Sequence, residues 1–264
     1  MDLVMALIKW FKEIPTGIDG IPLPQDRIGT LEQILHENFD QGYIVESVSR
    51  LKSKKNTVIS LEIHPEDAKP ITLVAKMFIA GRFKNELSIL RASWAHGLAV
   101  PNILDARDDV IVMSFISGET LVDRINQTFE PHLIDKLAEW YYHYHRVHGQ
   151  IKGDPRLRNF IVHNDQIFGV DFEESGEGFW MVDIAGVCAS LLDTNPIFDP
   201  RKRKLSWRFL EKYLSFLDVS PDETMYTDFI STLADTLKQT SDWRKDNRIL
   251  ELSEKIRAEG LPID

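Results

Sequence analysis

Three polar residues, Asp154, Asn159 and Asp171, stand in the stretch IKGDPRLRNFIVHNDQIFGVDFEE with a spacing that suits phosphoryl transfer. Transfer of a phosphoryl group from ATP requires carboxylate and amide oxygens that hold Mg²⁺ against the phosphates, and one further carboxylate beside the acceptor hydroxyl. An Asp, a later Asn and then a strand-turn-strand that ends in Asp-Phe supply these groups in that order. Taken alone, the same residues also fit an ordinary surface loop with turn-forming Asp and Asn.

A lysine and a glutamate earlier in the chain favour the chemical interpretation. Lys76 stands inside the apolar run VAKMF, where a buried charge is costly unless it is paired or functional. Glu86 follows on a predicted helix, RFKNELSIL, and is placed to pair with that lysine. The run IVMSFISGETL then predicts a strand that enters an exposed linker. Four such features in this order are much less expected by chance than any one of them.

The elements that position these residues change character along the chain. Runs rich in β-branched and aromatic residues predict strands at 43–49, 57–63, 71–78 and 109–116. Apolar periodicity predicts helices at 30–38, 82–96 and 130–148, and the runs NFIV and IFGVDF predict a hairpin between Asn159 and Asp171. A strand-rich first part and a helical second part give the α+β class, with two lobes joined near 114–118.

With these motifs in this order, the chain resembles the protein-kinase-like superfamily over most of residues 43–195. The resemblance implies a bilobal fold with a β-rich N-lobe at 43–113 and an α-helical C-lobe at 114–264, preceded by a helical extension at 1–42. It also implies an ATP- and Mg²⁺-dependent phosphotransferase.

The resemblance assigns roles to single residues. VAKMF resembles the strand with the ATP-anchoring lysine, Lys76, which pairs with Glu86. IVMSFISGETL is similar to the hinge, with Met113 as gatekeeper and the backbone of Ser114 and Ile116 facing adenine. KGDPRLRN resembles the catalytic loop, and VDFEE stands where the family has its metal-binding Asp-Phe-Gly. These two segments give Asp154 as the catalytic base, and Asn159 and Asp171 as the Mg²⁺ ligands.

Variant details resemble the small atypical kinases rather than ordinary protein kinases. Gly-Asp in place of Arg-Asp is similar to aminoglycoside, choline and RIO kinases, and the later Asp183-Ile-Ala resembles the segment whose Asp braces the catalytic loop. His145 resembles the buried histidine at a helix end of this fold. Two departures stand out: RLKSKKN replaces the glycine-rich loop, and Lys152 replaces the usual histidine before Gly-Asp.

Basic residues gather near the predicted site, although the whole chain carries a formal net charge of -10. Three clusters suggest a polyanionic acceptor, with RNA first, as in archaeal tRNA kinases of this superfamily. The candidate acceptor-binding residues are Lys54, Lys55, Lys152, Arg156, Arg158, Arg201, Lys202, Arg203 and Lys204. Solvated loops give the same pattern, so a protein Ser/Thr acceptor, a small metabolite and a non-catalytic ATP-binding pseudokinase stay open.

Composition limits the remaining classes. The single cysteine, Cys188, excludes an intramolecular disulfide and a cysteine-based zinc site, which favours a reducing cytoplasm. The apolar run near the N-terminus is interrupted by Lys9 and Lys12, so it is too short to cross a bilayer and predicts an amphipathic docking helix instead. We therefore expect a cytoplasmic protein with no membrane partner.

Overall fold

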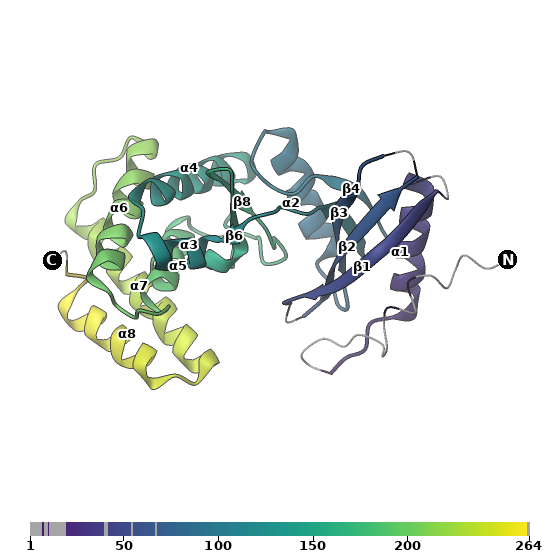
Figure 1. Ribbon diagram of the computed structural model, residues 1–264. Helices are drawn as coiled ribbons and strands as arrows, with labels where there is room; N and C mark the ends of the chain where they lie inside the picture. The colour runs from purple at the N-terminus through teal and green to yellow at the C-terminus, as the bar shows by residue number, and fades with distance from the viewer. Residues whose placement is uncertain are drawn as a thin grey trace. The chain divides into compact units, whose positions relative to one another are not determined.

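The computed structural model describes Leu7, Trp10 and residues 20–39, 42–53, 55–66 and 68–262 (Figure 1). The docking helix predicted near the N-terminus lies outside these residues, as does Lys54. The chain divides into two compact units: an N-terminal unit of residues 1–91 and 101–116, and a C-terminal unit of residues 92–100 and 117–264. Within the described ranges, no helix is both long enough and apolar enough to span a membrane.

The N-terminal unit is built on one antiparallel sheet. Its strands are β1 (Tyr43–Leu51), β2 (Thr57–Pro65), β3 (Ile71–Met77), β4 (Ile103–Arg107) and β5 (Val110–Ser114). They are ordered β1-β2-β3-β5-β4, so β3 lies in the middle and pairs Lys76 with Val58 on one side and Ile111 on the other. A lysine of a central strand is thereby placed among apolar neighbours.

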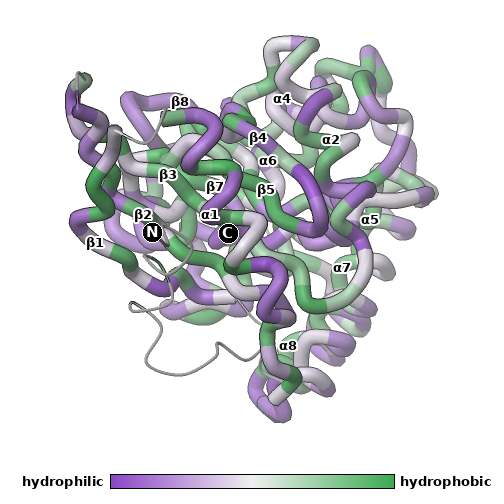
Figure 2. The backbone as a smooth tube through the Cα atoms, turned by 90° about the vertical axis from the view of Figure 1, so that its right-hand side faces the viewer, coloured by the Kyte–Doolittle hydropathy of each residue, from purple (hydrophilic) through white to green (hydrophobic). Residues whose placement is uncertain are grey.

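Helix α1 (Gln25–Asn38) supplies the other half of this unit's core. Its buried residues Ile28, Leu31, Ile34 and Leu35 pack with buried residues of β2, β3 and β5. In β2 buried and half-buried positions alternate, as expected for a strand with one face on a core, whereas β5 is buried almost throughout and green along its length in Figure 2. Helix α2 (Phe83–Ala95) follows β3 and carries Glu86 in its first turn.

The C-terminal unit is mainly helical. Its helices are α3 (Leu121–Thr128), α4 (Pro131–His148), α5 (Met181–Leu192), α6 (Pro200–Leu217), α7 (Glu223–Arg244) and α8 (Asn247–Glu259). Helix α5 is almost entirely buried, because α6 and α7 both pack against it and α8 packs on α7. Such an apolar helix forms the centre of the unit, and the chain segments beside it are held in place by its packing.

A small sheet positions the loops of this unit. It consists of β6 (Glu119–Thr120), β7 (Phe160–His163) and β8 (Gln166–Gly169), in that order. The β7–β8 hairpin confirms the prediction for this segment, and it places Asn159 directly before β7 and Asp171 two residues after β8. The α+β class expected from the sequence is confirmed, although strand β4 was not predicted.

Candidate active site

The predicted pair in the N-terminal unit is formed. The Lys76 ammonium lies 2.5 Å from Glu86 Oε2, and both side chains are buried. Lys76 also lies 5.1 Å from the centroid of the Phe78 ring. A buried charge that loses its partner is strongly unfavourable, so this ion pair ties β3 to the first turn of α2.

The predicted hinge follows β5. Met113 is buried, as expected of a residue beneath the linker. Ser114 uses its main-chain N–H to donate to Asn102 O at 2.8 Å, so that group is not available to a ligand in this conformation. For Ile116 no main-chain hydrogen bond to another described residue is found, which leaves its backbone as the better candidate for contact with a base.

The loop that replaces the glycine-rich loop is anchored by an asparagine. Asn56 is buried, and its side-chain oxygen accepts a hydrogen bond from the Ile79 main-chain N–H at 3.3 Å. Its own N–H donates to Ser53 Oγ at 3.3 Å. Lys55, one residue earlier, is exposed. The end of the turn between β1 and β2 is therefore held by hydrogen bonds of side chains. A glycine-rich loop has no such side chains and depends on the conformational freedom of its backbone.

The predicted catalytic loop brings Asp154 and Asn159 into direct contact. Asn159 Nδ2 donates to Asp154 Oδ2 at 3.0 Å and to the Asp154 main-chain oxygen at 3.2 Å. Asn159 is buried and lies in the 3-10 turn Leu157–Asn159, whereas Asp154 is partly exposed. Because the amide nitrogen is committed to Asp154, the amide oxygen of Asn159 is the atom that remains suited to a cation.

Asp183 braces this loop from the first turn of α5. Its two carboxylate oxygens accept hydrogen bonds from the main-chain N–H groups of Lys152, at 2.6 Å, and Gly153, at 3.1 Å. Gly153 has φ +82, and a Cβ there would lie 2.1 Å from Glu174 O, so the turn requires glycine. The bracing role inferred from the resemblance is confirmed by these contacts.

His145, near the end of α4, completes the support. Its Nε2 lies 3.0 Å from Asp183 Oδ2, and its Nδ1 lies 2.7 Å from the Tyr213 hydroxyl of α6. Burial raises the pKa of the Tyr213 hydroxyl, which keeps it a neutral hydrogen-bonding group. A chain of side chains from α6, α4 and α5 therefore holds the backbone immediately before Asp154.

Lys152 connects the catalytic loop, which carries Asp154, to the segment after β8, which carries Asp171. It is 0% exposed, and its ammonium donates to the main-chain oxygens of Asp171, at 2.8 Å, and Asp154, at 3.2 Å. The same ammonium lies 5.1 Å from the ring centroid of Phe172 and 5.5 Å from that of Phe160. Cation–π contacts and hydrogen bonds to carbonyl oxygens together accommodate a cation in an otherwise apolar place.

Asp171 has the left-handed conformation, with φ 63. This region is uncommon for residues other than glycine, and such residues cluster at functional sites. The main-chain oxygen of Asp171 faces Lys152, while its carboxylate and the amide oxygen of Asn159 are ligands of the kind that Mg²⁺ prefers. The donor set of this unit therefore fits a magnesium ion, with Asp171 and Asn159 as the residues that would hold it.

Several of the basic residues expected to form acceptor-binding clusters are buried or paired with acidic residues in the structure. Lys152 and Lys202 are both 0% exposed, which corrects their assignment to a surface cluster. Lys202 donates to Thr194 O at 2.7 Å, and burial lowers its pKa to about 8. Arg201 pairs with Asp199 at 2.7 Å.

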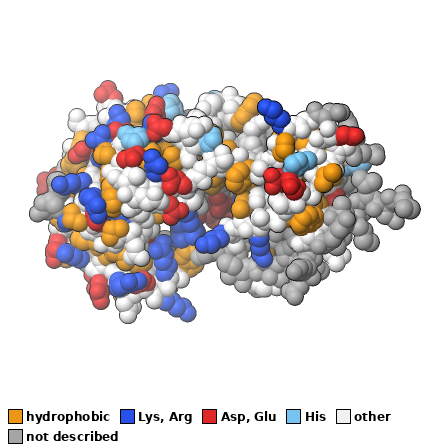
Figure 3. All heavy atoms as spheres, viewed as in Figure 1, with side chains coloured by type: hydrophobic (Ala, Val, Ile, Leu, Met, Phe, Trp, Pro, Cys, Tyr) orange, Lys and Arg blue, Asp and Glu red, His pale blue; other side chains and the backbone are white. Residues whose placement is uncertain are grey.

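Arg203 and Lys204 are the two remaining members of that run. The guanidinium of Arg203 lies 5.0 Å from the ring centroid of Phe198, and Lys204 is exposed. On the face shown in Figure 3, Lys and Arg side chains of the C-terminal unit lie among Asp and Glu side chains. The run 201–204 is therefore not a continuous basic patch.

Arg156 and Arg158, in contrast, remain beside the catalytic loop. Arg156 Nε lies 3.3 Å from Asp154 Oδ1, and its guanidinium carbon lies 4.2 Å from the ring centroid of Trp243. Arg158 is exposed. Trp243 and its neighbour Arg244 were not predicted as site residues, although the segment SDWRKDNR combines an aromatic with basic residues at a helix end.

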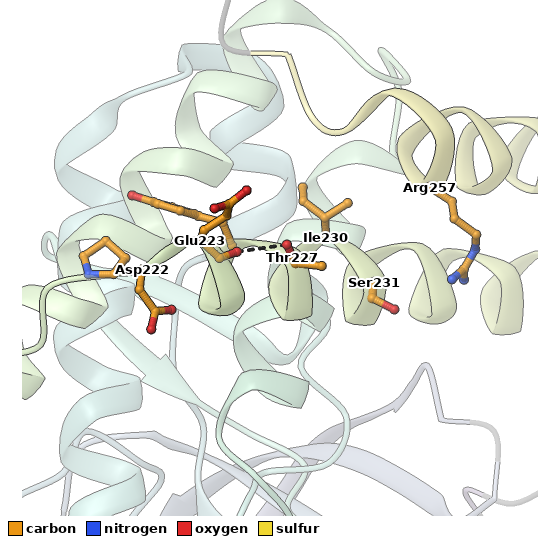
Figure 4. A pocket seen from close by; sticks show the side chains of 8 residues that line it. Asp222, Glu223, Thr227, Ile230, Ser231 and Arg257 are labelled. Carbon is orange, nitrogen blue, oxygen red and sulfur yellow. Dashed lines mark hydrogen bonds between the residues drawn. The ribbon is translucent and has the colours of Figure 1, made fainter.

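A hollow elsewhere in the C-terminal unit is separate from these residues (Figure 4). The Thr227 hydroxyl in it donates to Glu223 O at 2.9 Å, so this polar group is satisfied within α7. The hollow is lined by Pro221, Asp222, Glu223, Tyr226, Thr227, Ile230, Ser231 and Arg257. None of them belongs to the loop that carries Asp154 and Asn159.

Sequence comparisons match the central part of the chain. The RIO domain family model matches residues 65–177, a span that contains Lys76, Glu86, Asp154, Asn159 and Asp171. A curated relative from Archaeoglobus fulgidus, named "Probable serine/threonine-protein kinase BUD32 homolog", is 34% identical over 91 residues, which is 34% of this chain. The matched segment spans 44% of the length of that relative.

Solved structures match over most of the chain. The amicoumacin kinase hAmiN has a TM-score of 0.60 at 15% identity, over 88% of this chain and 96% of that one. An ethanolamine kinase of Plasmodium vivax has a TM-score of 0.53 at 12% identity, over 87% and 83% of the two chains. The choline kinase LicA of Streptococcus pneumoniae has a TM-score of 0.52 at 15% identity, over 88% and 99%. At these identities the likeness establishes the fold.

Proposed function

We propose that the chain is a member of the protein-kinase-like superfamily and an ATP-dependent phosphotransferase that acts on a hydroxyl acceptor, because it matches the RIO domain family model over residues 65–177 and has the fold of solved kinases. The observation that carries the proposal is the arrangement of Asp154 and Asn159 in hydrogen-bond contact, with Asp171 tied to the same loop through Lys152. A surface loop of ordinary turn residues would not be braced by Asp183 and by a fully buried lysine.

In the proposed reaction the acceptor oxygen attacks the γ-phosphorus of ATP, and the bond from that phosphorus to the bridging oxygen of ADP breaks. Asp154 orients the attacking hydroxyl and accepts its proton. Asn159 holds the Asp154 carboxylate in place through its amide nitrogen. Lys76, held by Glu86, contacts the nucleotide phosphates.

Bound Mg²⁺ would neutralise charge on the transferred phosphoryl group. Asp171 and Asn159 are the residues that would hold it. Met113 would be the gatekeeper, and the backbone of Ser114 and Ile116 would face adenine, chiefly through Ile116 because the Ser114 N–H is already used. Lys55 would lie near the phosphates in place of a glycine-rich loop, whereas Lys54, the other lysine expected there, lies outside the described residues.

For the acceptor we retain RNA as the first candidate, because Arg156 and Arg158 stand beside Asp154 and Lys204 is exposed. A protein Ser/Thr or a small metabolite is the alternative acceptor, and a non-catalytic ATP-binding protein is the alternative of another class. A cytoplasmic location belongs to the same proposal.

The test is isothermal titration of the protein with a non-hydrolysable ATP analogue, with and without Mg²⁺. We expect Mg²⁺-dependent binding that Asp171→Ala weakens while far-UV circular dichroism stays the same. Asp242→Ala, a change of an exposed aspartate on α7, serves as the matched control. If Asp171→Ala binds the Mg²⁺ complex as tightly as the wild type, the assignment of the site is wrong.

A further inference from the structure

Four side chains of the C-terminal unit form a surface next to Asp154, and none of them has a role in the proposed chemical step. They are Arg156, Arg158, Trp243 and Arg244, which we term the arginine–tryptophan surface. Arg156 and Arg158 come from the catalytic loop, whereas Trp243 and Arg244 come from the last turn of α7. Segments distant in sequence thus meet beside the predicted catalytic carboxylate.

Arg156 connects the two parts of this surface. Its Nε lies 3.3 Å from Asp154 Oδ1, and its guanidinium lies over the Trp243 ring at 4.2 Å from the centroid. A guanidinium that stacks on an aromatic face keeps its N–H groups in its own plane, roughly parallel to the ring, where they remain able to bind an anion. The contact fixes the indole within reach of whatever molecule approaches Asp154.

Trp243 is 49% exposed even with this guanidinium over its ring. An isolated exposed aromatic needs no explanation, but an exposed indole among arginines beside a catalytic group is a different case. Aromatic faces of this kind stack on nucleobases, and such stacking tolerates any base sequence. The surface therefore offers a stacking platform as well as positive charge.

The charge on the surface is concentrated. The pKa of Arg156 is lowered first by burial, and the neighbouring Arg158 and Arg244 charges lower it further. Arg244 Nη2 lies 3.1 Å from Asp193 Oδ2, and Asp193 is buried beneath it. Arg158 is exposed and makes no ion pair with any residue in the described part of the chain.

The balance of charges decides the acceptor class. Arg156 and Arg244 each face one carboxylate, Asp154 and Asp193, and the second of these is buried. A third carboxylate near Arg244, Asp246, pairs with Arg248 at 2.7 Å. A cationic acceptor would be repelled beside Asp154, whereas phosphate groups would be attracted. Acidic protein segments would also be attracted by arginines, but they would gain nothing from the exposed indole. The combination favours a nucleic acid.

We propose that the arginine–tryptophan surface binds one nucleotide unit of an RNA acceptor, with the base stacked on Trp243 and the flanking phosphates near Arg158 and Arg244. This proposal rests on the proposed phosphotransferase function. A ribose hydroxyl of the bound RNA is thereby presented to Asp154. Its oxygen bonds to the γ-phosphorus as the bond to ADP breaks, and its proton passes to Asp154, so the products are ADP and an RNA phosphorylated on a ribose hydroxyl.

The first experiment measures binding of a fluorescently labelled single-stranded oligoribonucleotide by anisotropy over a range of salt concentrations. Trp243→Ala should weaken binding on the order of 10-fold or more, and Trp243→Phe should restore most of the loss because phenyl rings also stack. The double variant Arg158→Gln/Arg244→Gln should reduce the slope of log affinity against log salt by about two, because each lost phosphate contact removes about one unit.

Two matched controls come from the same unit. Trp94→Ala changes another exposed tryptophan, and Arg257→Gln changes an arginine of α8 that pairs with Asp235 at 2.6 Å. Both variants should bind the oligoribonucleotide as the wild type does. Equal loss in Trp94→Ala and Trp243→Ala, or an unchanged salt slope in the double arginine variant, would overturn the proposal.

The second experiment follows transfer from γ-labelled ATP to an oligoribonucleotide with both ends blocked, and to the DNA of the same sequence. Label on the RNA and none on the DNA supports the ribose hydroxyl as acceptor. Preferred transfer to an acidic protein that is insensitive to Trp243→Ala overturns the proposal in favour of a protein acceptor. Binding of the Mg²⁺–ATP analogue, measured on the same samples, distinguishes failure of the proposed phosphotransferase function from failure of the RNA-binding inference. If the analogue does not bind, the phosphotransferase function is wrong. If the analogue binds but RNA does not, only the RNA-binding inference is wrong.

Discussion

The ammonium of Lys152 lies 2.8 Å from the main-chain oxygen of Asp171 and 3.2 Å from that of Asp154. One side chain therefore spans the residue expected to accept the proton and the residue expected to hold the metal. Its own peptide N–H is held by Asp183, so the lysine is anchored at both ends. This buried residue and the main-chain hydrogen bond from Val170 N–H to Asn159 O, at 2.9 Å, together hold the two aspartates relative to one another.

Replacement of Lys152 by Met should lower kcat roughly 10–100-fold, the range typical of residues that orient metal ligands from behind. Methionine fills a similar volume between Phe160 and Phe172 but cannot donate to the two carbonyl oxygens. The Mg²⁺ concentration for half-maximal activity should rise, because Asp171 is less well placed. Steady-state kinetics at varied Mg²⁺ measure both effects.

Lys152→His is the matched variant, since histidine is usual at this place in the family that the catalytic loop resembles. It should recover part of the activity that Lys152→Met loses. A loss of thermal stability with unaltered kcat and Mg²⁺ dependence in both variants would show that Lys152 is only structural.

Asp154→Asn should reduce phosphotransfer on the order of 10²–10⁴-fold, because the amide cannot accept a proton. Binding of the Mg²⁺–ATP analogue should remain, because Asp171 and Lys76 are unaltered. Asp235→Asn, at an exposed ion pair on α7, is the control and should keep normal turnover. Near-normal turnover of Asp154→Asn with any accepted substrate would contradict its assignment as the base.

The Lys76–Glu86 pair should behave as one unit in a double-mutant cycle. Lys76→Met alone removes the cation that pairs with the buried Glu86 carboxylate and should destabilise the fold by about 3–5 kcal/mol. Lys76→Met with Glu86→Gln should cost less than the sum of the two single changes. Urea unfolding measures the stabilities, and additive effects would show that the two side chains are not coupled.

Asp193 should make the stability of the protein depend on pH. Burial raises its pKa from 3.8 to about 6, against the lowering effect of the cations Arg244, Arg156, Lys202 and Arg158. The folded carboxyl thus binds its proton more tightly than the unfolded one. The stability that this provides is complete below about pH 4 and is lost as the pH rises through about 6.

The unfolding free energy of the Asp193→Asn variant should therefore rise relative to that of the wild type by about 2–3 kcal/mol as the pH is raised from 4 to 7. Urea unfolding at several pH values measures the difference. Asp199→Asn is the control of opposite sign, because the guanidinium of Arg201 lowers the Asp199 pKa to about 2. A difference between wild type and Asp193→Asn that does not vary with pH would contradict the prediction.

The fold was predictable where local pattern and tertiary environment agree. Strands β1, β2 and β3 are rich in β-branched residues and begin where the sequence predicts them. Strand β4 was missed because its sequence ILDAR carries two charges and lies at the sheet edge, where polar side chains are tolerated. Helix α1 begins at Gln25, earlier than predicted, directly after Pro24.

The site was predictable in its motifs but not in its use of cations. The contacts of Asp154 with Asn159 and of Lys76 with Glu86 follow the order and spacing of the residues. The burial of Lys152 depends on Phe160 and Phe172, which surround it only after β7 and β8 are folded. A lysine in a sequence is normally interpreted as exposed, because lysines are rarely buried in folded proteins. The sequence therefore does not reveal that this lysine is held by carbonyl oxygens and aromatic rings.

The only cysteine of the chain lies inside α5, where burial raises the pKa of its thiol and the sulfur contacts Ser206 O at 3.6 Å. Thiolate is the species that reacts with maleimides, so Cys188 should resist labelling while the protein is folded. A cysteine introduced at exposed Lys204 would then be the single reactive thiol. The native sequence can thus carry one fluorophore at a chosen place, without any cysteine having to be removed first.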